Sequence, residues 1–319
     1  MLRREFFFTS AATALATRVA FGSGRLSHID RVDRALRGAE VDRAPYSFWH
    51  HFGLKTAEAH AAATLDFHRT YRTDIVKVMS DFPYPKPSGK WYELKPLENP
   101  FPDQIRALEQ IRQGLNGDAY FVETVFNSFN VAEKLSSKEE VRRLKAEDPE
   151  ALLAALDVIT QSQINHAKRA IAAGASGILL AVANANSKEL SVADYARFNA
   201  PFDKRLLDAV QDQPLNVLHL HVDREYLDQF TNFSAPVLNY SLHVTGIPIA
   251  DVRAMFPGKV IAAGIDEVRY RQLTAAQIRA QWMAASRAAG PRFILTPGCS
   301  VPNDSTAAEL SRLPRVLSA

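Results

Sequence analysis

Short apolar runs alternate with amphipathic helical patterns along most of the chain. Eight of these runs are rich in Val, Ile, Leu, Phe and Tyr and have the length of a buried strand, which predicts eight β-strands. They span residues 44–51, 74–81, 119–126, 175–183, 214–222, 235–243, 259–266 and 291–298. Helical patterns lie between them, so the chain is predicted to be an α/β protein.

The predicted helices carry features typical of helix ends. Ser137 and Glu140 have the spacing of a capping box, and Pro149 suits the first turn of the next helix. Thr274 can cap a helix that ends at Gly290. Eight strands with intervening helices predict a single (β/α)8 TIM barrel over residues 25–319. The main alternative, a doubly wound open sheet, usually has a glycine-rich phosphate loop after its first strand, and "WHHFGLK" is unlike such a loop.

Polar side chains gather at the predicted carboxyl ends of the strands, where a TIM barrel places its functional groups. Burying them without partners would cost ~1–3 kcal/mol each, so we expect a shared polar cavity at the barrel mouth. In chain order they are His50 and His51, Asp81, Glu123 and Asn127, Asn184 and Asn186, His219 and His221, Asn239, Ser241 and His243, Asp266, and Cys299.

His219 and His221 are separated by one residue in "NVLHLHVD" and therefore point to the same side of their strand. Such a pair can bind one metal ion, and Cys299 can reach that ion across the mouth. Two imidazoles, a thiolate and an open fourth position are typical of a catalytic zinc site, where zinc lowers the pKa of a bound thiol or water. The alternative for each residue is structural, as a hydrogen-bonded core histidine or a small buried cysteine.

Composition excludes some classes of protein. The 319 residues are 47% hydrophobic and 23% charged, which is enough for a large core, and no linker-like segment marks a domain boundary. The formal charge is +3, and removing residues 1–22 takes away three arginines and one glutamate, which leaves +1. This balance argues against nucleic acid as a partner. Cys299 is the single cysteine, so no internal disulfide can form.

The first 24 residues, "MLRREFFFTSAATALATRVAFGSG", predict an export leader. Arg3 and Arg4 followed by Phe6 and Phe7 resemble a twin-arginine signal, and small residues follow. The apolar run is far shorter than the ~20 residues that a spanning helix needs, and no other stretch approaches that length. We therefore expect a periplasmic protein; a basic leader or anchor helix that is not a signal would leave it cytoplasmic.

Together these features resemble the uroporphyrinogen decarboxylase superfamily, which includes zinc-dependent methyltransferases that act between corrinoid proteins and thiols. The resemblance runs from about Arg31 to Leu317 and implies a single (β/α)8 barrel. The segments that carry it are "RVDRALRGAEVDRAPYSFW", "DIVKVMSD", "GASGILLAVANANSKELSVADYARFNAPFDKRLLDAV", "LNVLHLHVD", "KVIAAGIDE" and "FILTPGCSVPNDST".

The decarboxylase branch of the superfamily binds a porphyrinogen through arginines after the first strand and an aspartate after the second. Asp81 matches that aspartate, but His50 and Leu54 occupy the arginine positions. Bidentate cations are thus missing where a polyanionic substrate would need them. Cys299 also takes the place of the C-terminal histidine of the decarboxylases.

The methyltransferase branch holds zinc through a histidine, a cysteine two residues later and a cysteine in the last barrel strand. His219 and Cys299 match the first and last of these ligands, and His221 replaces the middle cysteine. The resemblance therefore implies zinc at this site and a possible corrinoid partner. Imidazole in place of thiolate makes the site less electron-rich, which makes water activation relatively more favourable.

The favoured hypothesis is a metal-dependent transferase of methyl or other one-carbon groups, or a related hydrolase or lyase, that acts on a small molecule. Its metal ligands are His219, His221 and Cys299. Its predicted catalytic residues are Asp81, His50 and His51, and its predicted substrate-binding residues are Asn184, Glu123, Asn239 and Asp266. The alternatives are a tetrapyrrole decarboxylase that needs no metal, and an exported protein that holds a metal or tetrapyrrole without turnover.

Overall fold

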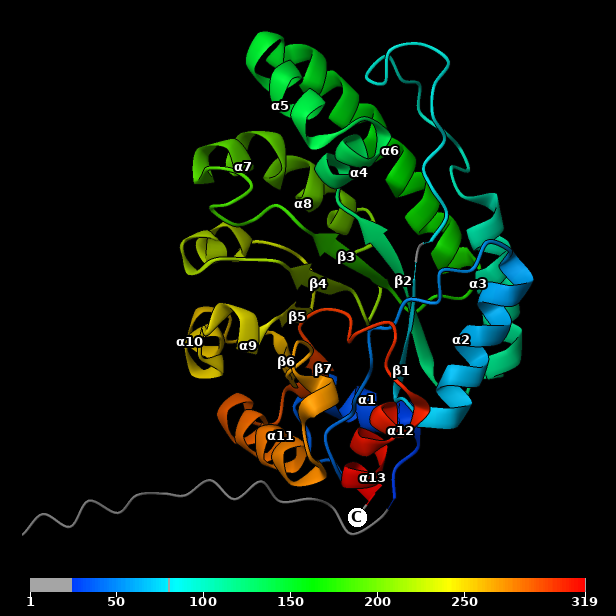
Figure 1. Cartoon of the computed structure of the whole chain (residues 1–319), viewed down its shortest axis with the longest axis vertical. Helices are drawn as coiled ribbons and strands as arrows, with labels where there is room; N and C mark the ends of the chain where they lie inside the picture. The colour runs from blue at the N-terminus through cyan, green and yellow to red at the C-terminus, as the bar shows by residue number, and fades with distance from the viewer. Residues whose placement is uncertain (1–24, 80, 319) are drawn as a thin grey trace, which may run out of the picture.

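A computed structural model describes residues 25–79 and 81–318. Its centre is one parallel sheet of seven strands in which each strand pairs with the next along the chain, in the order β1 to β7. Figure 1 shows the sheet curled at the centre with helices around its outside. The strands are β1 Ile75–Val78, β2 Tyr120–Phe126, β3 Ile178–Val182, β4 Val217–Leu220, β5 Val237–Tyr240, β6 Val260–Ile265 and β7 Phe293–Pro297. The fold is a TIM-like barrel with seven regular strands.

The predicted strand at residues 44–51 is the one that does not form, so the expectation of eight strands is wrong. Tyr46 makes only an isolated parallel bridge with Leu295. Pro45 has no N–H to donate, and the N–H of Tyr46 donates to the side chain of Asp74 instead of to a strand (2.9 Å). The segment still joins the two sheet edges, because Ser47 N donates to Leu295 O (3.1 Å) and Asp74 N donates to Tyr46 O (2.9 Å).

Helices lie before the first strand, between the strands and after the last one. Their bounds are α1 His28–Arg37, α2 Ala57–Tyr71, α3 Pro102–Leu115, α4 Ser128–Leu135, α5 Lys138–Glu147, α6 Pro149–Ala172, α7 Val192–Phe198, α8 Ala200–Asp208, α9 Leu242–Thr245, α10 Ile249–Met255, α11 Ala275–Ala289, α12 Ala307–Leu310 and α13 Arg312–Ser318, with 3₁₀ turns at Arg224–Phe230 and Tyr270–Gln272. None of these helices is both long and apolar enough to cross a bilayer.

The helix ends follow the predicted sequence features with one difference. Thr274 and Gln277 form a complete capping box at α11, which is followed by Gly290. Ser137 accepts a hydrogen bond from the backbone N–H of Glu140 at the start of α5. The Glu140 carboxylate, however, pairs with Arg143 (2.9 Å). Pro149 is the first residue of α6.

Alternation along the strands sorts side chains between the barrel interior and the helices. One interior cluster packs apolar residues from every strand, namely Ile75, Val122, Leu179, Val217, Val237, Val260 and Ile294. Two residues further along each strand, the same interior side carries Lys77 on β1, Thr124 on β2, His219 on β4 and Asn239 on β5. The polar residues therefore form a layer next to the apolar one, closer to the carboxyl ends of the strands.

The predicted leader at residues 1–24 lies outside the described residues.

Candidate metal centre at the barrel mouth

His219 and His221 face one another from the end of β4. Their Nε2 atoms are 3.1 Å apart, His219 is buried, and His221 remains accessible to solvent. Two imidazole nitrogens bound to one zinc ion at tetrahedral angles would be about 3.3 Å apart, given Zn–N bonds of ~2.0–2.1 Å. The pair therefore has the separation that a shared ion requires.

Cys299 brings the third donor atom from the other side of the mouth. One ligand atom from each of His219, His221 and Cys299 lies within 4.8 Å of the others, so this cluster can hold a metal ion. Gly298 makes the approach feasible, because a Cβ added there would lie 2.1 Å from Ser241 Cα. Only glycine lets the chain after β7 pass so close to the end of β5.

Asn239 on β5 fixes which nitrogen of His219 faces the cluster. Asn239 Nδ2 lies 2.9–3.0 Å from the carbonyl oxygens of Ala262 and Pro297. Because carbonyl oxygens only accept, the Oδ1 atom must point the other way, toward His219 Nδ1. His219 Nδ1 therefore carries the proton and donates it to Asn239, which leaves the lone pair of Nε2 for a metal.

The surroundings favour the protonation states that metal ligands need. Burial lowers the pKa of His219, which favours the neutral imidazole. Burial alone would raise the pKa of Cys299, but its interactions with His219 and the charge of Lys77 bring that pKa below the usual thiol value. A neutral imidazole and a thiolate are the forms that bind zinc.

The cluster opens into a cavity of about 210 Å³, which we call the metal cavity. Its walls include Lys77, Thr124, Phe126, His219, His221 and Cys299. Sequence reasoning missed Lys77, whose pKa is lowered by burial to about 8. A lysine at an interior position of the otherwise apolar run "DIVKVMSD" was the feature that could have identified it. The metal cavity thus contains a cation near the Cys299 thiol.

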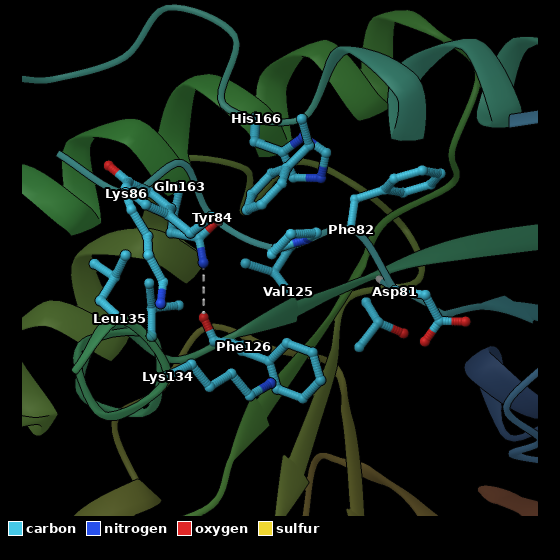
Figure 2. A pocket seen from close by; sticks show the side chains of 14 residues that line it. Asp81, Phe82, Tyr84, Lys86, Val125, Phe126, Lys134, Leu135, Gln163 and His166 are labelled. Carbon is cyan, nitrogen blue, oxygen red and sulfur yellow. Dashed lines mark hydrogen bonds between the residues drawn. The ribbon is translucent and has the colours of Figure 1, made fainter. Parts of the chain in front are cut away.

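Figure 2 shows a second cavity of about 250 Å³, which we call the side pocket. It lies among the loop after β1, the end of β2, and helices α4 and α6. Its walls include Phe82, Tyr84, Phe126, Lys134, Gln163 and His166. Thr124 and Phe126 line both cavities, so these two residues of β2 stand between them.

The three predicted catalytic residues lie in three places, two of which are in contact. His51 lines the metal cavity, and its Nδ1 lies 3.5 Å from Oδ1 of Asp81, which lines the side pocket. Burial alone would raise the pKa of Asp81, but the interaction with His51 lowers it. His50 lies elsewhere, with its ring stacked on Phe67 of α2 at a centroid distance of 5.4 Å.

The predicted substrate-binding residues are also dispersed. Asn239 contacts a metal-ligating candidate, as described above. Glu123 points to the helices, where it accepts one hydrogen bond from Gln104 of α3 (2.7 Å) and pairs with His166 of α6 (2.9 Å). Asn184 donates to Glu133 (3.2 Å), and Asp266 pairs with Arg269 (2.7 Å).

Comparisons with known proteins place this geometry in context. The profile of a family described as uroporphyrinogen decarboxylase (URO-D) matches residues 85–317. A methyltransferase from Methanosarcina mazei has the same fold with a TM-score of 0.77 at 16% identity, covering 92% of this chain and 99% of that chain. A search among curated protein sequences finds no significant match.

More distant structures share the fold. A B12-independent methionine synthase from a Shewanella species, solved in complex with selenomethionine, superposes with a TM-score of 0.59 at 11% identity, covering 86% of this chain and 94% of that chain. An endo-1,4-beta-mannanase from Rhizomucor miehei superposes with a TM-score of 0.51 at 8% identity, covering the same shares. Because such different enzymes share the barrel, the activity must be argued from the site.

Proposed function

Since the chain belongs to the uroporphyrinogen decarboxylase family, we propose that it is a zinc-dependent transferase of methyl or other one-carbon groups. The observation that carries this proposal is the convergence of donor atoms from His219, His221 and Cys299 within 4.8 Å at the barrel mouth. The similarity in fold to a methyltransferase supports it. The substrate is a small molecule with a thiol or another group that such an ion can activate.

The residues present fit a zinc ion. The donor set of two imidazoles and one thiolate leaves a fourth position free, and a bound zinc would lower the pKa of a thiol or water there. Asn239 holds His219 in the tautomer that presents Nε2. His51 Nδ1 faces Asp81 (3.5 Å), so Nε2 is the ring nitrogen that remains to accept the proton that such a thiol releases.

Metal analysis of the purified full-length protein tests the site. We expect about one zinc per chain in the wild type and its loss in a variant with His219→Ala, His221→Ala and Cys299→Ala. Asn184→Ala is the matched control, since Asn184 is near the mouth and outside the cluster, and it should retain zinc. Circular dichroism verifies that each variant is folded.

Two results would contradict the proposal. Unchanged zinc content in the triple variant would remove the site. Loss of carboxyl groups from uroporphyrinogen incubated with metal-free protein would instead favour a tetrapyrrole decarboxylase.

The cellular location is a separate proposal. Residues 1–24 are proposed to direct export, which would separate the enzyme from corrinoid proteins in the cytoplasm and favour a different one-carbon donor. Fractionation of cells that express the wild type and a variant with Arg3→Lys and Arg4→Lys tests this. If residues 1–24 direct export, the wild type should be found in the periplasm and the variant should not. Retention of both proteins in the cytoplasm to the same extent would contradict export.

A further inference from the structure

The side pocket is a candidate binding site that the metal centre does not use. Its walls are largely aromatic and aliphatic, with Phe82, Tyr84, Phe101 and Leu135 among them. Such a lining suits the apolar body of a ligand. The two cavities have volumes of about 250 and 210 Å³, and each is smaller than a typical small-molecule site of ~300–1,000 Å³. Their combined volume falls within that range.

Lys134 of α4 gives the side pocket a positive charge. Its Nζ atom lies 3.1 Å from the centroid of the Phe126 ring (Figure 2), and among the described residues it has no ion-pair partner within 4.0 Å. Desolvation lowers the pKa of Lys134 to about 8, so most of it is still charged at neutral pH. The carboxylates of Asp81, which lines the same pocket, and Glu133 act on Lys134 from beyond that distance. An ammonium group with no close ion-pair partner in a largely apolar pocket favours an anion over a neutral ligand.

Two deeply buried atoms on the α6 wall also lack partners. Gln163 Nε2 donates to the carbonyl oxygen of Phe126 (3.1 Å, dashed in Figure 2), whereas Gln163 Oε1 has no hydrogen-bond partner among the described residues. His166 Nε2 is engaged by Glu123, and its Nδ1 has no partner there either. Both side chains are at most 2% exposed. Gln163 Oε1 only accepts, and His166 Nδ1 also accepts when Nε2 donates to Glu123, so an N–H or O–H group on the body of a ligand, or a water, is expected to complete these atoms.

We propose that the side pocket binds the distal half of the substrate, an apolar body that ends in an organic anion paired with Lys134. The other end of the same molecule passes Phe126 and reaches the metal cavity. The placement of this other, reactive end rests on the proposed function, because the metal centre defines where that end must lie. The anion is a carboxylate or a sulfonate, which share the chemistry that an ammonium group recognises.

Calorimetric titration of the purified, metal-stripped full-length protein tests the anion site alone. The probes are hexanoate, hexanesulfonate and the neutral isostere hexanamide. We expect the better of the two anions to bind about tenfold more tightly than hexanamide, which corresponds to one charge-assisted hydrogen bond. Lys134→Met should abolish this difference, and Lys138→Met, a control in the next helix that removes an exposed cation, should preserve it. Equal binding of the anions and hexanamide, or an unaffected Lys134→Met variant, would overturn the proposal.

A second titration tests the connection between the cavities. The protein is loaded with Co²⁺, and 6-mercaptohexanoate and 8-mercaptooctanoate are added while the thiolate-to-cobalt absorption band is recorded. We expect the band to saturate at about tenfold higher thiol concentration in Lys134→Met, and at an unchanged concentration for 2-mercaptoethanol. A band with 2-mercaptoethanol alone would overturn the connection and leave the metal site intact.

Failure of the proposed function has a different outcome. If the protein takes up no metal, the cobalt titration gives no band with any thiol. The hexanoate titration is independent of metal and still decides whether the side pocket is an anion site. The variant with His219→Ala and Cys299→Ala should therefore bind hexanoate like the wild type.

Discussion

At the scale of single residues, Asn239 decides the geometry of His219. Its amide is fully buried and is held by backbone carbonyls of β6 and β7, so the orientation of Oδ1 is not free to change. Asn239→Ala removes the acceptor of the His219 Nδ1 proton and allows the other tautomer. We expect zinc affinity to fall roughly 10–100-fold, the range for lost outer-shell partners of ligating histidines. Competition with a chromophoric chelator measures it.

Asn184→Ala is the control for this experiment. It also deletes an asparagine amide near the mouth, but the hydrogen bond it removes goes to Glu133. Its zinc affinity should equal that of the wild type. Equal losses in both variants would show that a general disturbance of the mouth, rather than the tautomer of His219, sets the affinity.

Lys77 is expected to stabilise the thiolate of Cys299. A positive charge near a thiol favours its anionic form, so Lys77→Met should raise the pKa of Cys299. In metal-free protein, the pH dependence of alkylation by iodoacetamide should shift to higher pH. Lys134→Met deletes a cation in the neighbouring side pocket and should leave the profile in place. A profile that is identical in Lys77→Met and the wild type would contradict this role.

Residue positions were predictable only where alternation along a strand decides them. The i, i+2 spacing of His219 and His221 correctly predicted that both rings lie on one side. The same rule places Glu123 on the opposite side from Thr124 and Phe126, toward α3 and α6, and Glu123 lies in the middle of β2 instead of at its predicted carboxyl end. The orientation of Asn239 could not be predicted, because it depends on carbonyls from two other strands.

At the scale of elements, the approach of β7 to β5 depends on Gly298. In Gly298→Ala, the new Cβ would clash with the backbone of Ser241, and the chain that carries Cys299 must move. We expect a loss of stability of roughly 1–3 kcal/mol, as for other overpacked sites, and weaker zinc binding. Urea denaturation and chelator competition measure the two effects.

Gly258→Ala is the matched control. A Cβ at Gly258 would meet nothing within 4 Å, and its backbone does not have a positive φ. Its effect on stability should stay within about 0.5 kcal/mol. A Gly298→Ala variant as stable as this control, with normal zinc affinity, would show that the close approach of the segments after β5 and β7 is not needed for stability or for zinc binding.

At the scale of the whole molecule, the alternation of apolar runs and helical patterns was sufficient to predict a TIM-like barrel. Its seven regular strands lie within the predicted ranges. The predicted strand at residues 44–51 does not form, because Pro45 has no N–H to donate and the N–H of Tyr46 donates to the Asp74 side chain. The two cavities were not predictable, because they form between loops and helices that are far apart in the sequence. Lys134 and His166, for example, line the same pocket because α4 and α6, which are separate in the sequence, pack on each other.

The opposite end of the barrel is held by a buried charge network. Arg31 of α1 binds both Asp42 (2.7 Å) and Asp74 (2.6 Å), and Arg43 and His28 also contact Asp74. These contacts join α1, the segment that bridges the sheet edges, and the start of β1. Burial alone would raise the pKa of Asp42, but the Arg31 hydrogen bonds lower it to about 2.

This network predicts how stability depends on pH. Because the pKa of Asp42 falls from 3.8 to about 2 on folding, its contribution is fully present above pH 3.8 and is lost as the pH falls toward 2. The shift corresponds to about 2 kcal/mol. Asp42→Asn should therefore be less stable than the wild type by about this amount at pH 7, and the difference should shrink between pH 4 and pH 2. Urea denaturation at several pH values measures this difference in stability.

The control is Asp157→Asn, which breaks an exposed pair with Arg205 and should change stability by at most ~1 kcal/mol. A constant difference between Asp42→Asn and the wild type from pH 7 to pH 2 would show that the Asp42 charge does not stabilise the fold.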